Sequence, residues 1–303
     1  YIYANPMFSK HTNGIGNGGG TTVIAGYSGL GKSTFTYLNM LLPMVYRGEP
    51  CALFSNEQQV DYFQAMTYSF ISANVFKYYK LTRSKIENGD FNEYEEELMD
   101  KIDAFLERRN FSEMLYFFPL EEFNIDEIIR ISKGLISHEG ATCFLIDTFK
   151  PEDSSTDNYT GSMLECVKKL DGFGNKYSVK VICTMQLTAG SEMQQAYLRA
   201  NLLAECKSVK TVCDLLFLMR DVVNDLELDP NNKKYYLQPY RLVRKKRTIA
   251  GESEWKEEEI KLSERDREFE YRLFFLDKSR RGKRDLIMLM RFNSLTGRFE
   301  EVG

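Results

Sequence analysis

The chain lacks several features that would place it in a specialised class of protein. Its 303 residues include only two histidines, which stand far apart and therefore suggest no metal site. The six cysteines form no C-x-x-C pair, and most stand in apolar, strand-like runs, so we interpret them as buried thiols in a reducing compartment. No apolar run is long enough to span a bilayer and no signal peptide is visible, so we expect a cytoplasmic protein without a membrane partner.

The chain also lacks a strong charge of either sign. Its net charge of −4 gives no hint of nucleic-acid binding, so any such contact must come from local patches or backbone amides. With 43% apolar and 28% charged residues, the composition is ordinary for a globular protein, and the length suffices for one large α/β domain or two small ones. Because the chain begins with Tyr1 rather than methionine, we expect a fragment or a chain from which parts were removed.

One stretch fits a functional motif at every fixed position. Residues 26–33 match the phosphate-binding loop pattern G-x-x-x-x-G-K-[S/T]. Its glycines let the backbone turn tightly and direct several N–H groups at one phosphate chain. Lys32 supplies a positive charge for the β- and γ-phosphates, and the Ser33 hydroxyl is placed to ligate Mg²⁺. The residues that we expect to bind the nucleotide are Gly26, Tyr27, Ser28, Gly29, Leu30, Gly31, Lys32, Ser33 and Thr34.

The surroundings of this loop agree with the motif. Residues 21–25 form a short β-branched run that predicts a strand, and residues 34–42 follow a helical pattern without breakers until Pro43. The helix directs its positive end at the same phosphates. The alternative is a tight turn that caps a helix and leaves the lysine in solvent, but the order of strand, glycine loop and helix favours a nucleotide site.

Short apolar runs alternate with helical patterns along most of the chain. We expect strands at residues 21–25, 51–55, 114–118, 142–147, 179–185 and 214–219. We expect helices at residues 34–42, 57–80, 84–110, 124–137 and from about 160 to 175, with loop and helix at 188–205. Repeated alternation of strand and helix predicts an α/β fold with a mostly parallel central sheet flanked by helices.

Four regions depart from this alternation. Residues 1–20 are polar and rich in glycine and predict a leading loop or linker, which leaves residues 21–303 as the main domain. Residues 221–270 are charged and poor in apolar residues, and we interpret them as a protruding insertion with a long hairpin as one possible form. Residues 271–277 and 285–292 predict a C-terminal β-hairpin around Gly282. The polar stretch 151–160 predicts a mobile loop.

Three polar side chains fall at the ends of predicted parallel strands, where ligands bind in such sheets. Asp147 can hold Mg²⁺, directly or through water. Glu57 can orient the water that attacks the γ-phosphate or accept its proton. Gln186 donates as well as accepts hydrogen bonds, so it can sense a γ-phosphate. The structural alternatives are a cap at a strand end for Asp147, a solvated residue opening a helix for Glu57, and a polar strand terminus for Gln186.

A group of cations occupies the turn at residues 278–284. Lys278 and Arg280 stand two residues apart, so on a strand-like segment they can point to the same side. They can reach the nucleotide of a neighbouring subunit as arginine fingers do, contact nucleic-acid phosphates, or form a solvated hairpin tip. The basic run at residues 244–247 has a binding and a solvated interpretation of similar weight.

Taken together, these stretches resemble the motor domain of the DnaB-like replicative helicases, which has a RecA-like fold. The phosphate loop resembles the first motif of that family, and residues 54–57 resemble the strand end with its catalytic glutamate, where the family more often has Leu in place of Asn56. Residues 144–147 resemble its Mg²⁺ motif, and residues 183–187 resemble the strand with its γ-phosphate-sensing glutamine, usually written S-Q-L. Residues 278–282 resemble its K-x-R-x-G turn, whose lysine and arginine act in trans.

The resemblance also indicates a loop that contacts DNA. Residues 204–208, followed by Asp214, are similar in spacing to the loop that lines the central pore of the family and touches DNA phosphates. This similarity implies DNA contacts by Glu205, Cys206 and Lys207. The family pattern at this loop is R-E-S-G, so Ala204 and Lys207 are departures from it.

The resemblance covers about residues 18–220 and 271–300 and implies a particular assembly. It implies ATP and Mg²⁺ as cofactors and a hexameric ring that encircles single-stranded DNA, hydrolyses nucleotide at subunit interfaces and translocates 5′ to 3′. A primase or a helicase loader is the further partner that it implies, although the primase-binding domain and linker helix of the family are not evident in this chain. We expect a location in the bacterial cytosol, or in the host cytoplasm if this unusual branch is viral, with an organelle as the alternative.

Two other functions share the same nucleotide site. Another RecA-like ATPase, of the strand-exchange or clock type, would hydrolyse ATP without unwinding a duplex. A nucleotide-gated adaptor or loader would bind ATP and a partner but barely hydrolyse. Unwinding separates the first alternative from a helicase, and rapid DNA-stimulated turnover excludes the second.

Overall fold

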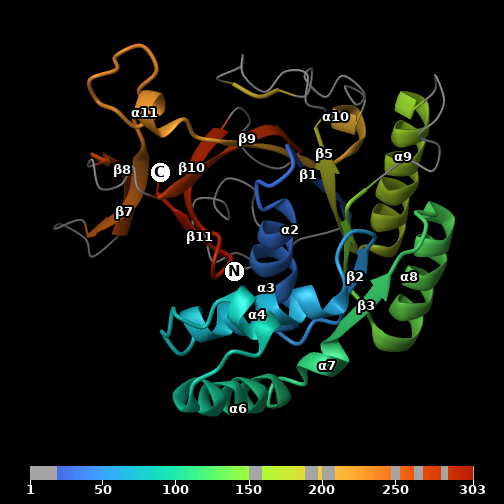
Figure 1. Ribbon diagram of the computed structural model, residues 1–303. Helices are drawn as coiled ribbons and strands as arrows, with labels where there is room; N and C mark the ends of the chain where they lie inside the picture. Colours follow the sequence, from blue (N-terminus) through green and yellow to red (C-terminus); the bar gives the residue numbers. More distant parts are fainter. Residues whose placement is uncertain are drawn as a thin grey trace.

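The fold is built around one nine-stranded sheet. The computed structural model of the protein describes residues 19–149, 159–187, 197–199, 209–246, 253–262, 269–280 and 286–302 (Figure 1). The strands are β1 (Gly20–Gly26), β2 (Cys51–Ser55), β3 (Leu115–Pro119), β4 (Cys143–Asp147), β5 (Lys180–Gln186), β6 (Leu215–Asp221), β7 (Tyr240–Lys246), β8 (Ser253–Glu259), β9 (Glu270–Ser279), β10 (Leu286–Asn293) and β11 (Arg298–Glu301). Their order in the large sheet is β11-β10-β9-β6-β1-β5-β4-β2-β3, and β7 and β8 form a separate pair.

The large sheet has a parallel part and an antiparallel part. The six strands from β6 to β3 pair in parallel, and β9, β10 and β11 continue from β6 as an antiparallel meander. The prediction of a mostly parallel sheet with a C-terminal hairpin is therefore confirmed. β11 was not predicted, because its four residues carry too little pattern to distinguish them from a loop.

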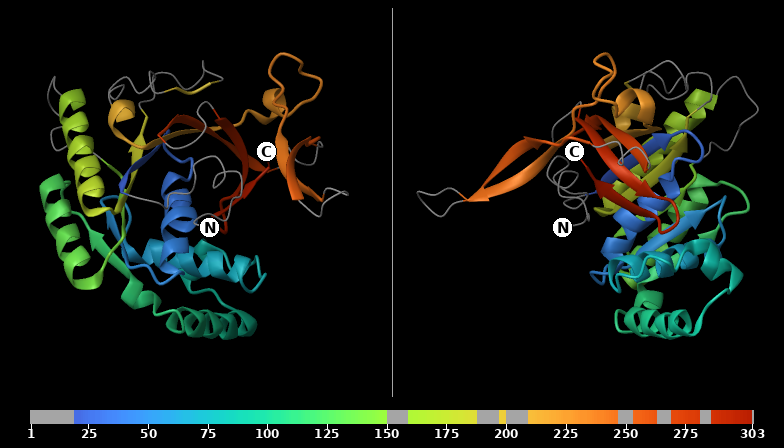
Figure 2. Two further views of the ribbon diagram at one scale, coloured as in Figure 1. Left: turned by 180° about the vertical axis from the view of Figure 1, so that it is seen from behind. Right: turned by 60° about the vertical axis from the view of Figure 1, so that its left-hand side comes forward.

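Helices cover both faces of the parallel strands (Figures 1 and 2). Their bounds are α2 (Lys32–Phe35), η1 (Thr36–Leu41), α3 (Leu42–Val45), α4 (Val60–Asn74), α5 (Arg83–Asn88), α6 (Glu93–Glu107), α7 (Phe111–Met114), α8 (Ile125–Glu139), α9 (Tyr159–Tyr177), α10 (Val209–Val212) and α11 (Asn224–Glu227). None of the helices in the described part of the chain combines the length and the apolar character needed to cross a bilayer.

Alternation along the strands explains why the sheet has an apolar core on each of its two faces. Successive side chains of a strand point to opposite faces, so Val23 and Ala25 face one layer while Ile24 faces the other. Apolar residues of α8 and α9 pack in the first layer, and those of α2, η1, α3 and α4 pack in the second. Because both faces are covered, the parallel strands are apolar almost without interruption, which is what made them visible in the sequence.

The helix after the phosphate loop does not end at Pro43, contrary to the prediction. It runs from Lys32 to Val45 and changes to π-helical geometry in its middle, where the Leu42 N–H bonds to the Tyr37 carbonyl five residues earlier. Proline lacks an N–H and ordinarily breaks a helix interior. Pro43 instead stands at the start of α3, directly after the widened turn, where a new α-helical segment begins.

The charged region predicted as one helix over residues 84–110 is two helices. α5 ends at Asn88 because Gly89, the next residue, adopts the left-handed conformation at φ 66°, and Asn92 then caps α6. The Asn92 side chain accepts from the Glu95 N–H, and the Glu95 carboxylate accepts from the Asn92 N–H, forming a capping box. The helix predicted over 57–80 is also shorter, since α4 ends at Asn74.

The region predicted as a protruding insertion contains a hairpin. β7 and β8 pair antiparallel, and the register sets Arg241 opposite Glu258 and Lys245 opposite Glu254. The pair projects from the side of the main sheet (Figure 2, right), so it adds surface to the molecule without extending its core.

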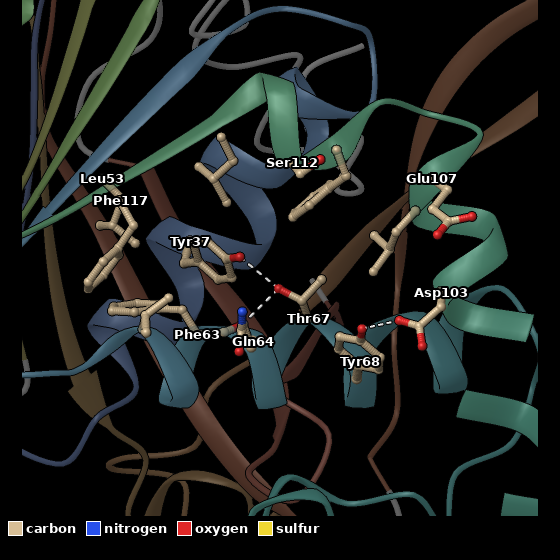
Figure 3. Close-up of a pocket in the computed structure, with 14 residues that line it drawn as sticks. Tyr37, Leu53, Phe63, Gln64, Thr67, Tyr68, Asp103, Glu107, Ser112 and Phe117 are labelled. Atoms are coloured by element: carbon tan, nitrogen blue, oxygen red, sulfur yellow. Dashed lines mark hydrogen bonds between the residues drawn. The ribbon is translucent and has the colours of Figure 1, made fainter. Parts of the chain in front are cut away.

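A cavity of about 450 Å³ lies between η1, α4, α6, α7 and the strands β2 and β3 (Figure 3). Phe63, Phe117 and other apolar side chains form much of its wall. Inside it the Tyr37 hydroxyl lies 2.7 Å from Thr67 Oγ1, which donates in turn to the Phe63 carbonyl. No residue of the phosphate loop lines this cavity, so it is separate from the site described next.

Candidate nucleotide-binding site

The predicted site residues at strand ends lie along one edge of the sheet. In the β2–β4 register Ser55 pairs with Asp147, and in the β1–β5 register Gly26 pairs with Gln186. β5 lies between β1 and β4, so the phosphate loop, Asp147 and Gln186 follow adjacent strands. Glu57 comes two residues after Ser55 at the same edge. Parallel alignment thus collects residues that are far apart in the sequence.

The phosphate loop needs glycine at two positions. Gly29 has φ 78° and Gly31 has φ 85°, in the left-handed region that side chains disfavour. Gly31 is also crowded, because a Cβ there would lie 3.0 Å from the Phe292 ring of β10. The loop is therefore shaped by its own glycines and seated against the antiparallel strands, and it opens into the helix that starts at Lys32.

The Lys32 ammonium lies inside the loop. Its Nζ donates to the Tyr27 carbonyl at 2.5 Å, and only 9% of the residue is exposed. Burial lowers the pKa of Lys32, while the negative charges of Asp147 and Glu57 act in the opposite direction. The ammonium therefore bonds to a carbonyl of its own loop and lies within the electrostatic influence of both carboxylates.

Asp147 is the most deeply buried carboxylate of this edge, with 1% exposed. Its Oδ1 accepts hydrogen bonds from Ser33 Oγ at 2.8 Å and from Thr184 Oγ1 at 2.7 Å. Its Oδ2 is buried and has no hydrogen-bond partner among the described residues. Burial raises the pKa of Asp147, although the two hydroxyl donors oppose that shift.

The donor set around Asp147 fits a magnesium ion. A hydroxyl and a carboxylate oxygen are ligands that Mg²⁺ accepts, usually together with waters and phosphate oxygens. A buried carboxylate oxygen without a partner is costly unless a cation or water completes it. Ser33 and Asp147 touch, so one ion could contact both the end of the phosphate loop and the end of β4.

Two residues of the site were missed by sequence reasoning. Thr184, in the buried part of β5, donates to Asp147, and its signal was a polar residue inside an apolar strand. Arg272 of β9 donates through Nε to the Leu30 carbonyl of the phosphate loop at 3.1 Å. Its guanidinium also pairs with Asp221 and Glu270, each at 2.7 Å. Arg272 therefore holds the loop from a strand 242 residues later, and its signal was a charge in an apolar run.

Lys278 and Arg280 do not join the phosphate loop of their own chain. β9 runs antiparallel to β6, and Leu215 at the start of β6 pairs with Ser279, at the opposite end from the loop. The seven residues of β1 separate the two ends by about 20 Å at roughly 3.3 Å per residue. Here Arg280 contacts Asp214 at 2.6 Å and the Val212 carbonyl at 2.5 Å. Burial lowers the pKa of Lys278.

The remaining predicted residues either belong to elements that the structure describes or lie outside the described residues. Thr34 follows Ser33 in α2 and is buried. The predicted DNA-contacting residues Glu205, Cys206 and Lys207 lie outside the described residues, as do most of the loop predicted at 151–160 and the stretch 188–196. Of the basic run 244–247, residues 244–246 belong to β7.

Comparison with known proteins bears on the fold. The chain is similar to a solved structure described as an ATPase domain, with a TM-score of 0.66 and 14% identity over 94% of this chain and 85% of that one. It is also similar to a DnaB-like replicative helicase solved to study its interactions with primase, with a TM-score of 0.71 and 13% identity over 98% of this chain and 62% of that one. No protein-family model matches the chain, and no curated protein matches it.

Structural similarity at such low sequence identity establishes the fold of the chain but not its activity. The resemblance to the motor domain of DnaB-like replicative helicases is confirmed as a likeness of fold. The chain spans less than two thirds of the helicase that was solved in relation to primase.

Proposed function

We propose that the protein is the ATP-hydrolysing motor of a replicative DNA helicase. The observation that carries the proposal is the contact between Ser33 of the phosphate loop and Asp147 of β4, next to a buried carboxylate oxygen that has no partner among the described residues. This arrangement suits a nucleotide with its magnesium ion. The likeness of fold to an ATPase domain and to a replicative helicase supports the choice among nucleotide-binding functions.

Each residue of the edge has a defined task in this proposal. The loop N–H groups and Lys32 bind the phosphates, while Ser33 and Asp147 hold the magnesium ion, which offsets negative charge on the phosphates when it is bound. Glu57 orients the attacking water and accepts its proton. Gln186, exposed at the end of β5, can hydrogen-bond the γ-phosphate and report its presence.

The assembly is part of the proposal. Lys278 and Arg280 lie at the opposite end of the strands from the phosphate loop, so a role at a nucleotide requires the loop of another subunit. We therefore propose that the chain forms a ring, a hexamer in the likeness of the family, in which these two residues complete the neighbour's site. The ring would enclose single-stranded DNA, contact it through residues 204–208, translocate 5′ to 3′, and meet a primase or loader in the cytosol.

The first experiment measures ATP turnover and duplex unwinding with and without single-stranded DNA. We expect DNA-stimulated hydrolysis and unwinding, both lost in the Lys32→Ala variant because no nearby residue replaces that charge. The matched control is Lys133→Ala, which removes an exposed lysine of α8. Turnover without unwinding would favour another RecA-like ATPase, and normal turnover in Lys32→Ala would remove the phosphate-loop assignment.

A mixing experiment tests the role of Arg280 between subunits. Arg280→Ala should bind ATP normally and lose roughly 10³-fold or more in turnover, as arginine fingers do. Mixing it with Lys32→Ala creates interfaces in which an intact loop meets an intact Arg280, so some activity should return. If mixed assemblies form and stay inactive, the proposed action in trans is wrong.

A further inference from the structure

The turn that carries Glu57 is held in place by several hydrogen bonds. Ser55, the last residue of β2, donates through Oγ to the Gln58 carbonyl at 2.8 Å and accepts from the Gln58 N–H at 3.0 Å. The Ser55 carbonyl accepts from the Leu120 N–H at 2.7 Å, just past the end of β3. These bonds close the turn over residues 55–58 and fix it to the neighbouring strand on one side.

On its other side, the turn is hydrogen-bonded through Asn56 to the strand that carries Asp147. The Asn56 N–H donates to the Asp147 carbonyl at 3.0 Å, which is the next backbone bond beyond the Ser55–Asp147 pair. Its side chain then continues the pairing by one residue. Nδ2 donates to the Thr148 carbonyl at 2.9 Å, and Oδ1 accepts from the Thr148 N–H at 3.0 Å.

Only an amide of this length suits both Thr148 bonds. A peptide presents one N–H donor and one C=O acceptor, and the asparagine amide offers the complementary acceptor and donor. Leucine has neither group, and aspartate lacks the donor and would set a carboxylate against the Thr148 carbonyl. The bonds therefore depend on the identity of residue 56 and not merely on its size.

This hydrogen-bonded turn connects the two carboxylates of the site. Glu57 is covalently attached between Asn56 and Gln58, whose positions these bonds fix. Its charge acts on Asp147 and on Lys32, so the two carboxylates and the lysine share one electrostatic environment. A rigid link between them would fix the distance from the water-activating group to the metal-binding group.

We infer that Asn56 is a positioning residue that holds Glu57 in register with Asp147. The inference rests on the proposed function, because it assumes that Glu57 acts on the attacking water. Asn56 contributes to the rate of hydrolysis through Glu57 and contributes little to nucleotide binding, which depends on the phosphate loop. A general base must lie within hydrogen-bond reach of the proton it accepts, and small displacements of such a group slow a reaction strongly.

The test begins with Asn56→Leu, which keeps the number and branching of the side-chain heavy atoms and removes both side-chain bonds. We expect kcat for ATP to fall about 10- to 100-fold, while the Kd for a fluorescent ATP analogue changes by less than about threefold. Asn56→Asp, which is isosteric but replaces the amide donor with a charged carboxylate oxygen, should also lower kcat and serves if the leucine variant folds poorly. The matched control is Asn88→Leu, at the exposed end of α5, which should leave kcat unchanged.

A double-mutant cycle separates positioning of Glu57 from a general structural effect. Glu57→Gln alone should slow turnover, and adding Asn56→Leu should lower the residual rate by less than about twofold, because residues that act as a unit are non-additive. If Asn56→Leu costs the same factor in both backgrounds, or has no effect in the wild-type background, the inference is overturned. Wild-type turnover in Glu57→Gln would instead count against the proposed function.

Discussion

Two buried carboxylates of this chain contrast in how their charges are satisfied. Asp147 ends β4 at the edge of the sheet that carries the phosphate loop, and Glu95 lies in the first turn of α6, in the helical region around α5 and α6. Neither is appreciably exposed. Yet the pKa of Asp147 is raised by burial, whereas that of Glu95 is lowered.

The bonds around each carboxylate explain the difference. Burial alone would raise the pKa of Glu95, but Lys85, the Asn92 N–H and the Tyr78 hydroxyl outweigh it by bonding both of its oxygens. Asp147 accepts two hydroxyl donors on one oxygen and, among the described residues, none on the other. A carboxylate completed by its own chain stabilises the fold, and one left incomplete in the interior is suited to an external cation.

Of the substitutions considered, replacing Asp147 should have the largest effect on ATP turnover. Asp147→Asn removes the charge that would hold Mg²⁺, so we expect Mg²⁺-dependent ATP turnover to fall by about 100-fold or more. Without nucleotide, the variant should unfold at the same or a higher temperature, because a buried carboxylate with a raised pKa disfavours the folded state at neutral pH. Glu95→Gln is the matched control and should keep wild-type turnover. If Asp147→Asn instead lost stability and kept wild-type turnover, Asp147 would be a structural carboxylate and not a metal ligand.

Arg272 is a third buried charge. Like Glu95 it is paired within its own chain, but it also contacts the phosphate loop. Arg272→Met keeps much of the side-chain volume and removes the bond to the Leu30 carbonyl. We expect nucleotide affinity to weaken about 10-fold, since one charge-assisted hydrogen bond contributes about 1.5–3 kcal/mol to the order of the loop. Titration with a fluorescent ATP analogue measures this. Unchanged affinity would limit Arg272 to the stability of the sheet.

Glu95 should have a smaller effect that is confined to stability. Glu95→Gln removes the charge that Lys85 and Tyr78 complete, and we expect the free energy of unfolding to fall by about 1–2 kcal/mol at pH 7. The partial exposure of Lys85 screens the ion pair and keeps the effect modest. Urea unfolding compares this variant with Glu96→Gln, which alters an exposed neighbour on α6 and should change stability by only a few tenths of a kcal/mol.

The pH dependence of that stability difference is the finest test. Because the folded pKa of Glu95 lies below its ordinary value of 4.5, the charge stabilises the protein fully above that value. The stabilisation is lost as the pH falls through the folded pKa. The gap between wild type and Glu95→Gln should therefore narrow progressively as the pH falls below 4.5, as measured by urea unfolding at several pH values. A gap that does not narrow below pH 4.5 would contradict the lowered pKa.

Local patterns were enough to predict the sheet and the edge of the sheet at which the candidate residues meet. The phosphate loop is contiguous, and Glu57, Asp147 and Gln186 each follow an apolar run, so parallel strand geometry alone places them at one edge. The bonds that complete the site could not be predicted this way. Thr184 is 37 residues from Asp147, Thr148 is 92 from Asn56, and Arg272 is 242 from Leu30, and no periodicity relates such pairs.

Some errors were avoidable and others were not. Gly89 and the Asn92–Glu95 pair are recognisable signals for the end of one helix and the start of the next, so the break in 84–110 was present in the sequence. The π-helical turn before Pro43 was not, because it depends on how the helix packs on the sheet. Proline chemistry alone predicts a stop at that position.

The most direct test of the central claim measures how Mg²⁺ changes thermal stability in the presence of a non-hydrolysable ATP analogue. A ligand that binds only the folded state raises the melting temperature. If Asp147 is the incomplete carboxylate that receives the metal, adding Mg²⁺ should raise the melting temperature of wild type and of Glu95→Gln by equal amounts, and that of Asp147→Asn much less. Equal shifts in all three proteins would contradict the account.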